Sequence, residues 1–280
     1  MKRVTIALTL IAGAISASQA ADWSDTSISY RTGNTFAEPF NSKDIHKDII
    51  QLTHASGYTY GTNFFNLDML LSDKNDPSSK GASSGAQEFY AVYRNTVEWG
   101  KVSGSALKFG PVKDVGLTGG FDINTKTDAG YNSKKRMLVL GPTLMFDVPG
   151  LLNVGVYELW ESNAPYSTFT GISTPRYHYD PHPMLGAVWA FPIGSTKFTW
   201  EGYANFIAAK GKNEFGAATK PETNIDMQLM YDVGSLWGAK PKRFRAGIAY
   251  QYWKNKFGND SNKIVGATAR TPMVKVQYTF

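Results

Sequence analysis

The chain has 280 residues, no cysteine, 14% aromatic residues, a formal net charge of +6 and a mean hydropathy of -0.29. Without cysteine a disulfide framework is excluded, and after Ala20 no run reaches the roughly 18 apolar residues of a membrane helix. Such a chain could cross a membrane only with strands. The positive excess is too mild to indicate a nucleic-acid polymer as partner.

The first 20 residues have the pattern of a secretory signal peptide. Met1–Arg3 is basic, Val4–Ala17 is an apolar run, and Ser18–Ala20 supplies small residues at the cleavage positions. We therefore expect residues 1–20 to be removed after export and residues 21–280 to form a single domain.

Most of that domain alternates apolar and polar side chains with a period of two, which predicts strands with one apolar and one polar face. Many of these segments are close to the roughly nine to eleven residues of a tilted membrane strand. In chain order they are 25–31, 47–54, 63–71, 88–99, 115–124, 196–208, 224–233, 244–253 and 270–280. The last one ends in an aromatic residue, Phe280, as the final strand of bacterial outer-membrane barrels does.

Three further segments, 136–148, 151–160 and 184–191, are apolar on both faces. In a soluble sandwich they would be central core strands. In a barrel they give the inner wall an arc without charge, or an arc that an inward-folded loop 161–182 covers. Two registers are open for the inward residues: either Met137, Val139, Met145, Met184 and Val188, or Leu138, Leu140, Leu144, Leu185 and Trp189.

The connections between these segments alternate in length. Long polar connections fall at 32–46, 72–87, 125–135, 161–182, 209–223 and 254–270, and mostly short turns lie between them, with 100–111 as the exception. Long loops at one end and short turns at the other are typical of outer-membrane barrels. The pattern predicts an all-β protein, a transmembrane antiparallel up-and-down β-barrel of about 12 strands, with both termini on the periplasmic side.

Leu52–Asp68, which runs on to Ser72–Pro77, resembles a signature block of the Tsx-like nucleoside-specific outer-membrane channel family, which includes the related OmpK-type proteins. Phe109–Asp114 and the terminal aromatic strand extend the resemblance over the domain. The resemblance implies a monomeric twelve-stranded barrel in a Gram-negative outer membrane and diffusion of nucleosides. Some relatives are surface proteins or phage receptors, so a receptor or adhesion barrel with a closed lumen is the alternative.

The histidines give little support for catalysis or metal binding. His178 and His182 have metal-like spacing around Asp180, but Pro181 and Pro183 oppose the helix that would place both on one face. The Gly-x-Ser-x-Gly pattern occurs at Gly81–Gly85, but it falls in the expected polar connection 72–87 and not at a turn between a strand and a helix. We therefore predict no enzyme activity, no cofactor and no metal site.

Polar residues on the predicted inner faces are the candidate solute contacts, and Tyr90 and Tyr203 among them offer stacking surfaces to a base. The structural alternative is a set of charges that neutralise one another and hold the strand register. The candidates are Asp68, Tyr90, Arg94, Glu98, Asp122, Glu201, Tyr203, Asp226 and Arg245.

Together these patterns predict an outer-membrane channel for facilitated diffusion of nucleosides or similar small amphipathic solutes. Its other expected partners are outer-membrane lipid and the barrel-assembly machinery, which would engage the C-terminal strand that ends in Phe280.

Overall fold

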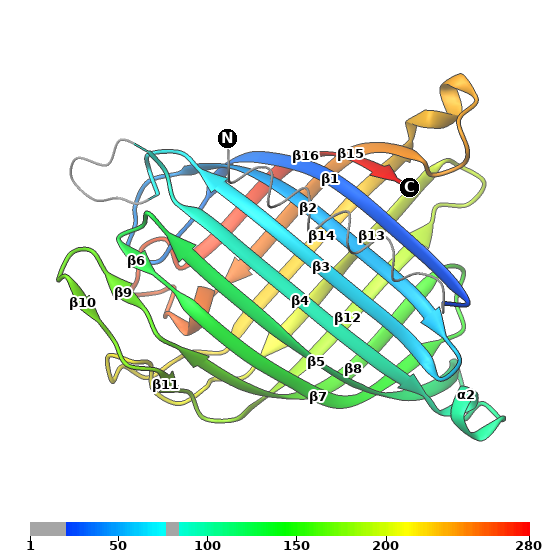
Figure 1. Cartoon of the computed structure of the whole chain (residues 1–280), viewed down its shortest axis with the longest axis horizontal. Coiled ribbons are helices and arrows are strands. Elements are labelled where there is room, and N and C mark those ends of the chain that lie inside the picture. Colours follow the sequence, from blue (N-terminus) through cyan, green and yellow to red (C-terminus); the bar gives the residue numbers. More distant parts are fainter. Residues whose placement is uncertain (1–20, 77–83) are drawn as a thin grey trace.

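The computed structural model describes residues 21–76 and 84–280. The predicted signal peptide, residues 1–20, lies outside this part of the chain. Within it, twelve long strands form a closed antiparallel barrel (Figure 1), as the sequence predicts. They are β1 (Trp23–Phe36), β2 (Ile45–Tyr58), β3 (Gly61–Ser72), β4 (Gln87–Glu98), β5 (Val112–Thr127), β7 (Lys134–Phe146), β8 (Leu151–Asn163), β12 (His182–Pro192), β13 (Phe198–Ile207), β14 (Glu222–Asp232), β15 (Phe244–Lys254) and β16 (Thr268–Thr279).

Each long strand pairs with its neighbours in chain order, and β16 pairs with β1 to close the ring, with Val276 opposite Tyr30. Closure removes the two free edges that an open sheet would expose, so the backbone hydrogen bonds of the wall are satisfied inside the sheet. No helix in the described part of the chain is long and apolar enough to cross a membrane.

The two faces of the wall differ in polarity. On β16, Lys275 is 5% exposed and points inward, whereas its neighbour Val274 is 58% exposed on the outer face. On β1, Ser29 and Arg31 are likewise buried inside, and Tyr30 is exposed outside. A soluble sandwich would bury the apolar face instead, so the barrel is the correct alternative.

The structure also decides the register of the three segments that are apolar on both faces. Val139 and Met184 are buried inside the barrel, whereas Leu138 and Leu185 are exposed outside, so the register that begins with Met137 is the inward one. Trp189 lies on the outer face and is nevertheless buried. It packs over Gly202, where a Cβ would come within 2.9 Å of the indole ring.

The inward residues of this arc pack against one another. Val139, Leu159 and Met184 form one cluster, with Met137, Tyr157 and Ile207 beside it. The hydrophobic residues that pack in this cluster include none from loop 161–182. Its short strands β9 (Tyr166–Ser167) and β10 (Ile172–Ser173) form a separate sheet with β6 (Tyr131–Asn132), and β11 (Tyr177–His178) extends the edge of β8.

The two ends of the barrel differ, as the alternation of connections predicts. Trp23 pairs with Gly57 and Ser27 with Thr279, so β1 begins and β16 ends beside the short turns, which we call the turn end. The connection 99–111 at this end contains α2 (Trp99–Ser103), and 233–243 contains η2 (Val233–Trp237). The long connections and η3 (Lys256–Gly258) lie at the opposite, loop end, with β6, β9 and β10 at the left of Figure 1.

Candidate functional site

Arg31 joins the two sides of the inner wall that flank β1. Its Nη1 lies 2.8 Å from Asp226 Oδ2 on β14, and its Nη2 lies 3.4 Å from Asp68 Oδ2 on β3. Gln51 donates to Asp68 at 2.8 Å and accepts from Lys275 Nζ at 2.9 Å. All five side chains come from different strands, so this network ties β1, β2, β3, β14 and β16 together from inside.

Two smaller groups complete the charged part of the wall. Arg94 Nη1 lies 2.5 Å from Asp122 Oδ1, and the hydroxyl of Tyr90 donates to Asp122 Oδ2 at 2.5 Å. On the other side, Arg245 Nη1 lies 2.7 Å from Glu201 Oε2. The structure thus places seven of the nine candidate residues in three paired groups.

The charges in these groups balance. The cations are Arg31, Arg94, Arg245 and Lys275, and the carboxylates are Asp68, Asp122, Asp226 and Glu201. Four positive and four negative groups leave this part of the wall without net charge. The solute-binding role of the candidates stays a prediction, because the same contacts also serve the strand register.

Glu98 lies apart from these groups, whereas Tyr203 lies next to the Arg31 group. The Glu98 carboxylate lies 3.6 Å from Lys101 of α2 at the turn end, away from the paired charges. Tyr203 sits on the inner face of β13, between its register partners Val188 and Asp226.

Two inward residues show that space remains inside the barrel. Phe64 on β3 is 40% exposed and Val188 on β12 is 41% exposed, although both point inward. Each lies near the turn end of its strand. Phe64 is not among the residues expected from the sequence, although its position two and four residues before Asn66 and Asp68 puts it on the same face.

At the loop end, Glu38 from the β1–β2 loop meets three lysines. Its Oε1 lies 2.7 Å from Lys47 Nζ, 3.1 Å from Lys256 Nζ and 3.6 Å from Lys126 Nζ. Lys126 forms a second ion pair, in which its Nζ lies 2.8 Å from Asp76 Oδ2. The three lysines and Asp76 are buried and the Glu38 side chain is 13% exposed, although all five belong to loops and strand ends.

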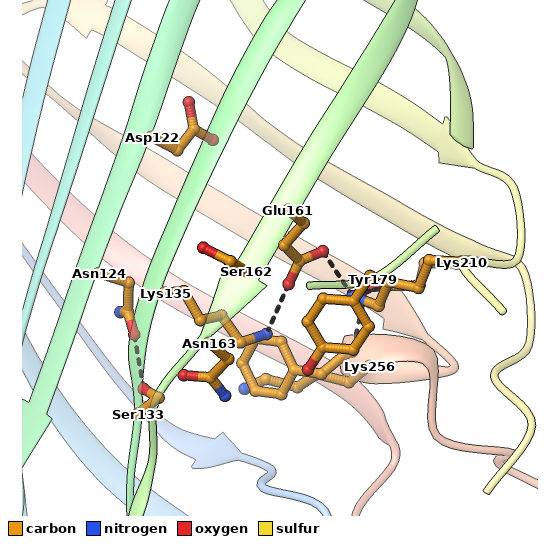
Figure 2. Close-up of polar contacts among 12 residues, drawn as sticks. Asp122, Asn124, Ser133, Lys135, Glu161, Ser162, Asn163, Tyr179, Lys210 and Lys256 are labelled. Carbon is orange, nitrogen blue, oxygen red and sulfur yellow. Dashed lines mark hydrogen bonds and ion pairs between the residues drawn. The ribbon is translucent and has the colours of Figure 1, made fainter. Parts of the chain in front are cut away.

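A second group of charges lies on the far side of the same end. Figure 2 shows Glu161 between Lys210 and Lys135, with contacts of 2.7 Å and 3.4 Å. Lys210 also lies 3.1 Å from Glu222, which accepts from the indole nitrogen of Trp253 at 3.1 Å.

Phe257 links the two groups. The ammonium group of Lys135 lies 3.7 Å from the centre of its ring, and that of Lys256 lies 5.2 Å from it. Lys135 is on β7 and Phe257 follows β15, with β8, β12, β13 and β14 between them, so the contact reaches across the mouth. Phe257 has φ 59°, a left-handed backbone that is strained for a non-glycine residue.

We call these ten residues the outer ion cluster: Lys47, Lys126, Lys135, Lys210, Lys256, Glu38, Asp76, Glu88, Glu161 and Glu222. Burial acts to raise the pKa of Glu38, but Lys126, Lys256 and Lys47 together hold that pKa well below its ordinary value. Burial likewise acts to lower the pKa of Lys210, and Glu161 and Glu222 raise it above the ordinary value. Both shifts favour the charged forms of Glu38 and Lys210, whereas burial lowers the pKa of Lys256 although Glu38 opposes that shift.

The two histidines of the metal-like spacing do not come together at a metal site. His178 is exposed on β11, whereas His182 is buried and its Nδ1 lies 2.8 Å from the carbonyl oxygen of Asp180. Among the described residues, no group of three or more His, Cys, Asp or Glu side chains could hold a metal ion.

Comparison with known proteins identifies similar folds only. No family model matches the chain, and no curated protein matches it. The chain is similar to the solved KdgM porin (12% identity, TM-score 0.42, 91% of this chain and 99% of that chain). It is also similar to the COG4313 outer membrane channel from Pseudomonas putida F1 (8%, 0.49, 93% and 97%) and to the translocator domain of the autotransporter NalP from Neisseria meningitidis (14%, 0.49, 100% and 96%). The resemblance to Tsx-like channels stays a prediction.

Proposed function

We propose that the protein is an outer-membrane channel through which small uncharged amphipathic solutes, nucleosides among them, pass by facilitated diffusion. The observation that carries the proposal is the accessible inner surface at Phe64 and Val188, inside a barrel whose four inner cations and four inner carboxylates balance in charge. About eight strands give a barrel that side chains fill, so twelve leave room for a narrow passage.

The outer face supports a position in a membrane. Leu138, Ile248 and Val274 are each more than half exposed on it, together with many other large apolar side chains. In water each exposed apolar Å² costs about 25 cal/mol, whereas lipid removes that cost. A closed barrel also leaves no unpaired strand edge in the hydrocarbon region.

The inner wall suits a solute with a flat apolar face and a hydroxylated edge. Val139, Leu159 and Met184 form an uncharged arc, and the paired charges occupy the remaining wall. Because these charges balance, the wall offers hydrogen bonds without attracting a net charge. A nucleoside fits this description better than a nucleotide, whose phosphate would bring its charge into a wall that has no net charge to balance it.

The outer ion cluster favours a second candidate function. A barrel whose mouth stays tied by this cluster would conduct nothing, and its loops would serve as a surface receptor or adhesion site. As a channel, the protein must separate these loops from the wall to pass solute.

Two measurements distinguish the functions. Single-channel recording in planar bilayers should show a small conductance with long closed periods, and liposome swelling should be faster with adenosine than with adenosine monophosphate or a disaccharide. Bilayers that contain folded barrel but show no conductance would contradict the channel function and favour the receptor function. A large conductance without solute preference would contradict the selective passage.

A further inference from the structure

The outer face carries an apolar groove near the turn end, of about 450 Å³. It lies between η2 and the wall formed by β15, β16 and β1, where the barrel closes. Its lining includes Ile28, Tyr30, Phe244, Ala246, Val276 and Trp237. This volume is within the about 300 to 1,000 Å³ range of sites that hold small organic ligands.

The groove results from one small residue and one overhanging ring. Ala246 lies between the larger Phe244 and Ile248 on the outer face of β15, which leaves a depression. Trp237, at the end of η2, packs against Phe244 with 5.7 Å between ring centres and is 60% exposed. Gly238 ends η2 with φ 78°, a left-handed backbone that glycine adopts without strain.

Three cations follow directly after η2. Lys240, Lys242 and Arg243 form no ion pair within 4 Å with any residue that the structure describes. Arg243 donates from Nε and Nη2 to the hydroxyl of Tyr278, itself a groove residue, at 3.2 and 2.8 Å. Asp232 accepts the backbone N–H of Lys242.

We propose that this groove binds one acyl chain of an anionic glycerophospholipid, with the lipid phosphate held by Arg243 and Lys242. The proposal rests on the part of the proposed function that places the barrel in a membrane, and it does not require that any solute passes. An apolar groove beside two cations without ion pairs, one of them held by Tyr278, matches both parts of such a lipid, because basic residues at a membrane surface attract anionic headgroups. The expected preference over a zwitterionic lipid is roughly fivefold for each cation.

Trp237 allows a direct test. The folded barrel is placed in phosphatidylcholine vesicles that contain a small fraction of either dibrominated phosphatidylglycerol or dibrominated phosphatidylcholine, and bromine quenching of tryptophan is measured. Subtracting the signal of Trp237→Phe isolates this ring from the other six tryptophans, since the chain has seven. Trp237 should be quenched at a severalfold lower fraction of the brominated anionic lipid.

The variants separate the two parts of the site. Lys242→Gln with Arg243→Gln should abolish the anionic preference, and Ala246→Phe should lower quenching by both lipids by filling the groove. Lys254→Gln, an exposed cation at the loop end, should change nothing. Equal quenching of Trp237 by both lipids in the unmodified barrel would overturn the proposal. Quenching of no tryptophan by either lipid would overturn the membrane position as well, whereas solute flux could fail without affecting this result.

Discussion

Glu38→Gln is the sharpest test of the outer ion cluster, because this one carboxylate faces Lys47, Lys126 and Lys256 at 2.7, 3.6 and 3.1 Å. The amide keeps the size of the side chain and removes its charge. Lys47 then keeps Asp76 and Glu88, and Lys126 keeps Asp76. Lys256 keeps no carboxylate within 4 Å among the described residues. The closed arrangement of the loops is therefore destabilised, while the wall below keeps its own pairs.

The size of the effect follows from the burial of the cluster. Removal of one partner from a buried ion pair costs about 3 to 5 kcal/mol. About 1.4 kcal/mol corresponds to a factor of ten, so the ratio of open to closed mouth should rise by roughly a hundredfold or more. In single-channel recordings this increase appears as shorter closed periods at unchanged open conductance.

Glu98→Gln is the matched control. It makes the same substitution, but its partner Lys101 is part-exposed, the pair lies at the turn end, and the contact is 3.6 Å. Glu98 has this one part-exposed lysine as its partner, at a longer distance and away from the mouth, so the gating should stay near that of the unmodified protein. If Glu38→Gln forms folded barrels whose closed periods match those of the control, the outer ion cluster is not the closure.

Four further outcomes are expected. The pKa of Glu38 is held below its ordinary 4.5, so its charge stabilises the closed mouth above about pH 4.5, and this stabilisation is lost as the pH falls further. Conductance should therefore be constant through neutral pH and rise only in strong acid. Val188→Asp should lower adenosine flux by roughly tenfold, which corresponds to the loss of about 1.4 kcal/mol of contact with the apolar inner wall. It should lower small-ion conductance less. Deletion of Phe280 should lower the folded yield seen as heat-modifiable mobility on gels, since its backbone N–H closes the barrel onto β1 at 2.9 Å. Arg31→Met should lower the free energy of unfolding by about 3 to 5 kcal/mol in urea titrations, because it leaves two buried carboxylates without their cation.

The alternation of side chains was enough to predict the wall. On β3 and β5 the polar residues Asp68 and Asp122 alternate with apolar neighbours, and both are buried inside, as the period of two requires. The same rule could not decide segments 136–148 and 184–191, where both faces are apolar. There the register depends on the pairing with the neighbouring strand, such as Val139 opposite Leu159, which a pattern with two apolar faces does not specify.

The outer ion cluster was not predicted, for a related reason. Lys126 and Lys135 fall in an expected loop, 125–135, whereas β5 continues to Thr127 and β7 begins at Lys134. Strands that extend beyond the lipid no longer need an apolar outer face, so the alternation fades before the strand ends. The partners of these lysines then come from loops whose path follows no local sequence pattern.

The ion pairs of the inner wall connect strands, whereas the outer ion cluster also connects loops. In the proposed channel, the inner wall therefore determines selectivity and the outer ion cluster determines access. Arg94 and Asp122 sit on adjacent strands, and Arg245 and Glu201 are two strands apart, so these pairs lie along the wall and stay with it. Lys256 reaches instead from one loop to Glu38 of another. Separation of the loop contacts can therefore open the mouth without breaking a barrel hydrogen bond, and the paired inner wall that a solute meets stays the same before and after opening.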